Sequence, residues 1–155
     1  MKDSSGMKGM VRMVCHRADG SLKWDTGWFP NGITNAGKAQ IALLAGDAAG
    51  VPFTFLGVGT SASAFAATQT ALVAEVTTNG LERVAATVSL VTTTTTNDTR
   101  RMVRTFTATG GTTVIQEVGF FNAISAGTMG GRALTGAKSM TTNDVLVVTY
   151  DLIFT

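Results

Sequence analysis

Apolar and polar residues alternate along much of the chain, and this pattern predicts β-strands. In residues 83–91, Val84, Ala86, Val88 and Leu90 fall on one face of an extended chain. Residues 144–154 are apolar on both faces, which predicts a central strand that is covered on both sides. Short strands joined by Gly and Asn turns favour a mainly β fold, a single antiparallel β-sandwich of jelly-roll or immunoglobulin-like type with one or two short helices.

The first predicted helix follows Pro30-Asn31-Gly32. Thr34 or Asn35 can cap it, and it runs to about Ala45 with Gly46 as its stop. Apolar residues within it predict one buried face, made of Ala39, Ile41, Ala42, Leu44 and Ala45. A second short helix is predicted for Thr68–Glu75, with Thr68 as its cap.

The chain has 155 residues and no segment that is typical of a domain linker. We therefore expect residues 10–155 to form a single β-sandwich domain. Residues 1–9 are rich in Gly, Ser and Lys, and we expect them to be a flexible N-terminal arm.

Charged residues make up only 14% of the chain, against about a quarter in typical soluble domains. This low charge suggests that copies of the chain or a partner cover much of the surface.

The net charge of +2 is too small, and the charged residues are too scattered, for nucleic-acid binding. No apolar run reaches the roughly 18 residues of a membrane span, and the polar N-terminus has no apolar signal-peptide region. Cys15 is the only cysteine, which excludes an internal disulfide and fits a reducing compartment during assembly.

Basic residues gather in one place, at Arg100, Arg101 and Arg104. Strand alternation points Arg100 and Arg104 one way and Arg101 the other. We interpret them as solvated or interface arginines rather than as phosphate contacts.

No catalytic, cofactor or metal motif is complete in this chain. His16 is the only histidine, and Cys15 points to the opposite face of the same strand, so the two cannot form a catalytic pair. Zinc needs three or four His or Cys ligands, and the chain has only His16 and Cys15. The aspartates and glutamates do not have the spacing of a calcium-binding loop. Gly57-Val-Gly59-Thr60 is half of a dinucleotide fingerprint, without its third glycine or a βαβ unit. We predict no enzyme activity, no cofactor and no metal.

Two glutamates stand inside otherwise apolar runs, Glu75 and Glu117. A buried unpaired charge is strongly disfavoured, so we expect Arg83 or backbone N–H groups to satisfy these carboxylates. Trp24 and Trp28 share a face if the strand alternates regularly, and that face is either core or an interface anchor.

Several of these segments occur in an order that resembles a known group of proteins. An apolar strand leads into Gly57-Val-Gly59-Thr60, and the segment Thr68–Glu75 follows it. Arg83 then opens a strand, and Ile115–Asn122 comes next. Last come a turn with a nearby arginine, made of Gly127, Thr128, Met129 and Arg132, and a closing strand. This order is similar to that of small structural proteins of tailed bacteriophages, most nearly the N-terminal domain of phage tail-collar fibre proteins. No fibre shaft or receptor-binding tip follows Thr155, so we expect something other than a complete fibre.

The resemblance implies a virion structural protein, assembled in the cytoplasm of a bacterial host and located in the phage particle. It would form a homo-oligomer and dock on other virion proteins, at the tail, collar or baseplate or on the capsid surface as a cement or decoration protein. Glu75, Arg83, Glu117 and Arg132 would be polar contacts that fix register, and no nucleic acid or membrane would take part.

Two other functions stay open. The alternative is a carbohydrate- or receptor-binding β module, which needs exposed aromatic side chains from among Trp24, Trp28, Phe29 and Tyr150. The third is an enzyme with a cleft that brings His16 next to a carboxylate, for which the sequence offers no motif.

Overall fold

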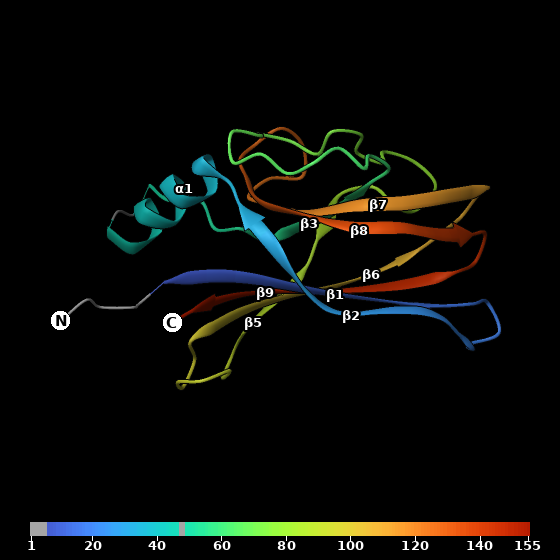
Figure 1. Ribbon diagram of the computed structural model, residues 1–155, viewed down its shortest axis with the longest axis horizontal. Helices are drawn as coiled ribbons and strands as arrows, with labels where there is room; N and C mark the ends of the chain where they lie inside the picture. Colours follow the sequence, from blue (N-terminus) through green and yellow to red (C-terminus); the bar gives the residue numbers. More distant parts are fainter. Residues whose placement is uncertain (1–5, 47–48) are drawn as a thin grey trace.

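The computed structural model describes residues 6–46 and 49–155 (Figure 1). Within these residues, nine strands form one antiparallel sheet in the order β4-β3-β7-β8-β2-β1-β9-β6-β5, beside a single helix. The elements are β1 (Met7–His16), β2 (Leu22–Ile33), α1 (Asn35–Gly46), β3 (Phe55–Gly59), β4 (Val84–Ala85), β5 (Thr87–Val91), β6 (Thr99–Thr107), β7 (Thr112–Phe121), β8 (Met129–Thr141) and β9 (Val145–Phe154).

The sheet folds over on itself into two layers, because β2 belongs to both. Gly32 and Ile33 pair with β8, whereas the earlier residues of β2 pair with β1. We call β4, β3, β7 and β8 the upper layer and β2, β1, β9, β6 and β5 the lower layer, as they lie in Figure 1. At the opposite edge only Ala86 separates β4 from β5, so the chain passes there from one layer to the other. The prediction of a mainly β, antiparallel sandwich is confirmed.

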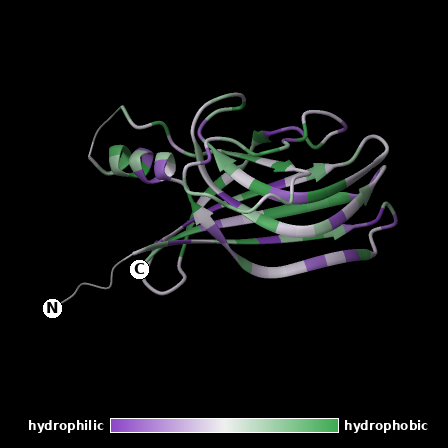
Figure 2. Ribbon diagram, turned by 45° about the horizontal axis from the view of Figure 1, so that its top comes forward, coloured by the Kyte–Doolittle hydropathy of each residue, from purple (hydrophilic) through white to green (hydrophobic). Residues whose placement is uncertain are grey.

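The main core lies between the layers and follows the alternation of the strands. Val11, Met13 and Cys15 of β1 lie in this core beside Tyr150 of β9, and the Tyr150 ring contacts Phe120 of the upper layer, which in turn contacts Phe53. Figure 2 shows the corresponding change between hydrophobic and hydrophilic residues along the strands. These apolar side chains leave water on folding, and this burial is the main stabilising contribution.

Strand β9 is central, as its apolar pattern predicts, but only one of its faces is fully covered. It pairs with β1 on one side and β6 on the other. Leu146, Val148 and Tyr150 face the core and are buried, whereas Val145 and Val147 face outward and are partly exposed. The expected covering of the outer face is therefore missing from the described part of the chain.

The N-terminal strand begins earlier than predicted. β1 starts at Met7, and Gly6 exchanges backbone hydrogen bonds with Thr155. Residues 7–9 of the expected arm thus belong to the sheet, because they continue the pairing of β1 with β9. Residues 1–5 of that arm lie outside the described residues.

Helix α1 has the predicted bounds and cap, but the predicted buried face is wrong. The Thr34 hydroxyl accepts the Gly37 N–H at 2.9 Å and donates to the Met129 carbonyl at 2.6 Å. Gly37 is the only buried residue of the helix, and a Cβ there would lie 2.1 Å from the Gly130 carbonyl oxygen. The helix therefore contacts β8 through its first turn and extends past the end of the sandwich (Figure 1). Ile41 is partly buried, and the other predicted core residues are exposed, namely Ala39, Ala42, Leu44 and Ala45.

The second predicted helix, Thr68–Glu75, is absent, and the segment is irregular. Its backbone is engaged by the edge of β3 instead. Thr60 donates its N–H to the Ala74 carbonyl at 2.8 Å, and Val76 donates to the Val58 carbonyl at 2.9 Å. We call residues 60–83 the covering segment, because they lie over the outer face of the upper layer (Figure 1).

Removing the cap of α1 tests its link to β8. We expect Thr34→Ala to lower the free energy of unfolding by about 1–2 kcal/mol, because the Gly37 N–H loses its acceptor. Thr34→Ser keeps the hydroxyl and should lose less. Urea denaturation followed by circular dichroism measures both, and equal losses for the two variants would contradict the capping role.

Candidate functional site

On the outer face of the upper layer, β3 and β7 carry glycines where the two strands lie side by side. Gly57 pairs with Gly119, and Gly59 pairs with Glu117. A Cβ at Gly59 would lie 2.4 Å from a Glu117 carboxylate oxygen and 2.6 Å from the Ala74 carbonyl oxygen. The two glycines of the Gly57-Val-Gly59 motif thus leave room for carboxylates and for the covering segment, which is a structural role.

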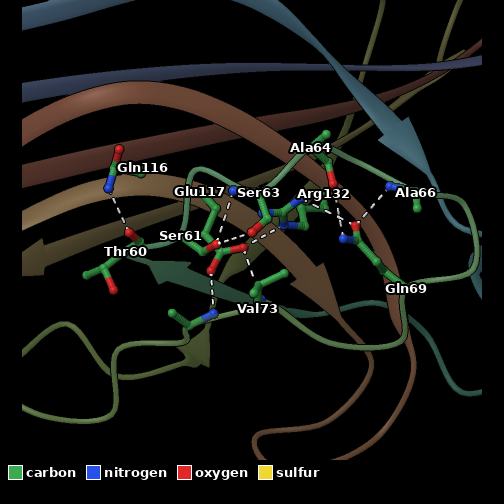
Figure 3. A network of polar contacts seen from close by, with 11 residues as sticks. Thr60, Ser61, Ser63, Ala64, Ala66, Gln69, Val73, Gln116, Glu117 and Arg132 are labelled. Carbon is green, nitrogen blue, oxygen red and sulfur yellow. Dashed lines mark hydrogen bonds and ion pairs between the residues drawn. The ribbon is translucent and has the colours of Figure 1, made fainter.

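Glu117 and Arg132 form a fully buried ion pair on this face (Figure 3). Both residues are 0% exposed, and the Arg132 Nε lies 2.5 Å from Glu117 Oε2. The same carboxylate accepts the N–H of Val73 at 3.1 Å and of Ala74 at 2.7 Å. These contacts compensate the desolvation of the carboxylate and fix the covering segment to the sheet.

Gln69 extends this network into the covering segment (Figure 3). Its side-chain oxygen accepts from Arg132 Nη1 at 3.3 Å and from the Ala66 N–H at 3.1 Å. Its amide nitrogen donates to the Ala64 carbonyl at 3.2 Å. A segment without regular structure thereby satisfies its backbone groups through side chains.

Glu75 and Arg83 form a second ion pair, at the far end of the covering segment. Arg83 Nε and Nη2 donate to the two carboxylate oxygens of Glu75 at 2.7 and 2.6 Å. Arg83 Nη1 also donates to the carbonyls of Ala123 and Ala126, and its guanidinium carbon lies 3.4 Å from the centroid of the Phe121 ring. Arg83 is therefore the partner of Glu75, as expected from the cost of burying a lone carboxylate.

Trp24 and Trp28 lie on opposite faces, so the prediction that they share one is wrong. Between them β2 carries an extra residue relative to β1, at Gly27, whose φ is +62°. Such a bulge reverses the alternation. Trp24 packs against the core with its Nε1 donating to the Ser139 carbonyl, whereas Trp28 is 44% exposed on the outer face of the lower layer.

No described helix or strand lies over that outer face, and we call it the lower-layer face. Its register brings together partly exposed apolar side chains from β1, β6 and β9, beside Trp28 of β2: Met10, Val14, Val103, Val145 and Val147. Two of its arginines are paired within the face, whereas Lys8, which lies opposite Ile153 of β9, is exposed and has no ion-pair partner among the described residues. Arg12 contacts Asp25 at 2.5 Å and Arg101 contacts Asp151 at 2.7 Å. These two ion pairs were not predicted from the sequence, because each joins residues on two different strands.

The groups considered for catalysis are not brought together. Cys15 is buried in the core and His16 points the other way, as predicted from alternation. Burial raises the pKa of the Cys15 thiol to about 11, so it stays protonated at neutral pH. Among the described residues, no three His, Cys, Asp or Glu side chains are grouped as metal ligands. Glu75 and Glu117 are both engaged by arginine.

Comparison with models of known families, with curated proteins and with solved structures finds no match to this chain. Helix α1 has 12 residues, and no described helix has the length and apolar character needed to cross a membrane.

The buried ion pair leads to a direct prediction for stability. We expect Glu117→Gln to lower the free energy of unfolding by about 3–5 kcal/mol, because Arg132 would remain buried without a counter-charge. Asp25→Asn, in the exposed pair with Arg12, is the control and should cost far less, since solvent screens that pair. Chemical denaturation measures both, and similar losses would contradict the role assigned to burial.

The close approach at Gly59 leads to another prediction. We expect Gly59→Ala to destabilise the fold by about 1–3 kcal/mol, because the new methyl group overlaps Glu117 and the Ala74 carbonyl. Gly46→Ala is the matched control, since a Cβ there meets no atom within 4 Å. Thermal unfolding by calorimetry compares the two, and an unchanged melting temperature for Gly59→Ala would refute the steric argument.

Proposed function

We propose that this protein is a structural subunit of a tailed-phage particle, without catalytic activity, that assembles as a homo-oligomer and docks on other particle proteins. The observation that carries the proposal is the uncovered lower-layer face. A central strand that is apolar on both sides is normally buried on both. In the described part of the chain no helix or strand lies over the outward Val145 and Val147 of β9, which stay partly exposed although Asp151 and Ile153 on the same side are buried, so a second polypeptide is the natural cover.

The charges of this face favour a second copy of the same chain as that cover. Arg12 and Arg101 are each paired with an aspartate inside the face, so little net charge opposes a like surface; among the described residues, Lys8 near the start of β1 is exposed there without a carboxylate partner. Two copies can meet through the same patch about a twofold axis, which is the commonest symmetry of homo-oligomers. The low content of charged residues, 14%, also supports assembly rather than an isolated subunit.

The assignment to a phage particle rests on the resemblance to tail-collar fibre proteins. The residues that carry it hold the covering segment in place, with Glu75 on Arg83 and Glu117 on Arg132. Their role is to position backbone rather than to react. The docking partner would be a protein of the tail, collar or baseplate, or the capsid surface for a decoration protein.

The alternative, a carbohydrate- or receptor-binding module, now depends on one aromatic side chain. Tyr150 is 0% exposed, and Trp24 and Phe29 pack against the core. Trp28 remains, beside Arg101 and Asp151 in a hollow of about 270 Å³. An aromatic ring with a polar edge suits such a partly wet site, but of the four candidate aromatics only Trp28 is exposed.

A charge placed in the middle of the lower-layer face tests the proposal. We expect the purified protein to be oligomeric and Val147→Lys to weaken association by about a hundredfold, because the lysine would be buried between subunits. Thr112→Lys is the control, on an exposed residue of β7 that lies outside this face. Light scattering after size-exclusion chromatography reports the mass of each variant.

A folded monomer for the unmodified protein at micromolar concentration would contradict homo-oligomeric assembly. Binding of sugars by that monomer, lost in Trp28→Ala, would instead support the alternative.

A further inference from the structure

A second apolar hollow lies at the end of the sandwich, between α1 and the core-facing side of the lower layer. It has a volume of about 390 Å³ and is lined mainly by apolar side chains, among them Ile41, Leu44, Phe53, Leu90, Leu152 and Phe154. We call it the end groove. Figure 2 shows hydrophobic residues in the helix beside the groove. Leu44 and the residues next to it in the helix are nevertheless exposed.

One charged side chain, Arg100, also lines the end groove. Its Nη2 donates to the Phe53 carbonyl at 3.2 Å, and its buried Nε has no hydrogen-bond partner. Within the described residues no carboxylate pairs with Arg100, whereas Arg12, Arg83, Arg101 and Arg132 each have one. Arg100 therefore offers a positive charge and an unused donor inside an apolar groove, where a carboxylate would be bound strongly.

The groove opens at the edge of the sheet. Leu90, Arg100 and Leu152 form one cross-strand row on the core-facing side of β5, β6 and β9. Leu152 is buried, Arg100 is partly exposed, and Leu90 is 60% exposed. β5 is the last strand of the sheet order, so one side of its backbone pairs with no other described strand. A free strand edge beside an apolar groove is the arrangement used in recognition by strand addition.

We propose that the end groove binds an extended segment of a partner protein, which adds to the edge of β5, places an apolar side chain against Leu44 and Leu90, and places a carboxylate against Arg100. Side chains two residues apart lie on the same face of a strand, so an apolar residue and an Asp or Glu at positions i and i+2 fit this groove. The occupant is a peptide because the strand edge offers main-chain hydrogen bonds that a lipid or fatty acid cannot use.

The end groove lies on the core-facing side of the lower layer, opposite to the lower-layer face. Peptide binding in the end groove therefore does not depend on homo-oligomer formation or on a phage origin. The peptide-binding proposal can fail while the proposed function holds, and the proposed function can fail while peptide binding holds.

A random heptapeptide library, displayed and selected on the full-length protein with counter-selection on Leu90→Lys, identifies the preferred sequence. The expected consensus has an acidic residue two positions from an aliphatic or aromatic one. Binding of the most enriched peptide is then measured by fluorescence anisotropy. We expect Arg100→Gln to weaken binding by about tenfold or more, and the peptide with Asn or Gln in place of its acidic residue to lose as much.

Arg104→Gln is the matched control. Arg104 lies on the same face of β6, and its Nε is also buried without a partner, but it does not line the end groove. It should leave peptide affinity unchanged. Thermal unfolding checks that each variant is folded.

The proposal is overturned if no consensus emerges, if the consensus lacks an acidic residue, or if Arg104→Gln weakens binding as much as Arg100→Gln. It is also overturned if sodium dodecanoate binds in the groove with a dependence on Arg100 while no selected peptide does, because the site would then hold a fatty acid.

Discussion

The buried pair of Glu117 and Arg132 is the interaction on which the upper half of the molecule depends. A carboxylate taken fully out of water needs a counter-charge and hydrogen-bond donors. Here the donors are the backbone N–H groups of Val73 and Ala74, so satisfying the charge also fixes the covering segment. The segment then places Leu72 over Phe121 in a second small core and brings Glu75 to Arg83.

This arrangement closes one side of the sandwich and leaves two other surfaces open. The upper layer has cores on both of its faces, whereas the lower layer has one. The lower-layer face carries partly exposed apolar side chains and two ion pairs that lie within it, which suits contact with a like copy. The end groove is narrow and carries an unpaired arginine, which suits a short segment of a different chain. Under the proposed function, the first surface would bind another copy of the chain and the second a different particle protein.

The sequence predicts the elements well where local rules decide, and less well where long-range contacts do. Apolar residues on both faces identify the central strand β9, and Thr34 identifies the start of α1, because both signals depend on neighbouring residues. The Thr68–Glu75 helix fails because Glu117 and β3 take up backbone groups of that segment. The buried face of α1 fails because the helix extends beyond the sheet that would have covered it.

For the candidate site too, local rules predict some features, and long-range contacts decide the rest. The need of Glu75 and Glu117 for partners follows from the cost of burying charge. Arg83 and backbone N–H groups were expected as those partners, whereas the pairing of Arg132 with Glu117 was not predicted. The separation of Trp24 from Trp28 could not be predicted, since it depends on one extra residue at Gly27 relative to β1.

Quantitative mass spectrometry of purified phage particles that encode this protein tests whether it acts as a particle subunit. We expect the protein to be present in a fixed whole-number ratio to a major particle protein. Its absence from purified particles would contradict the proposed function.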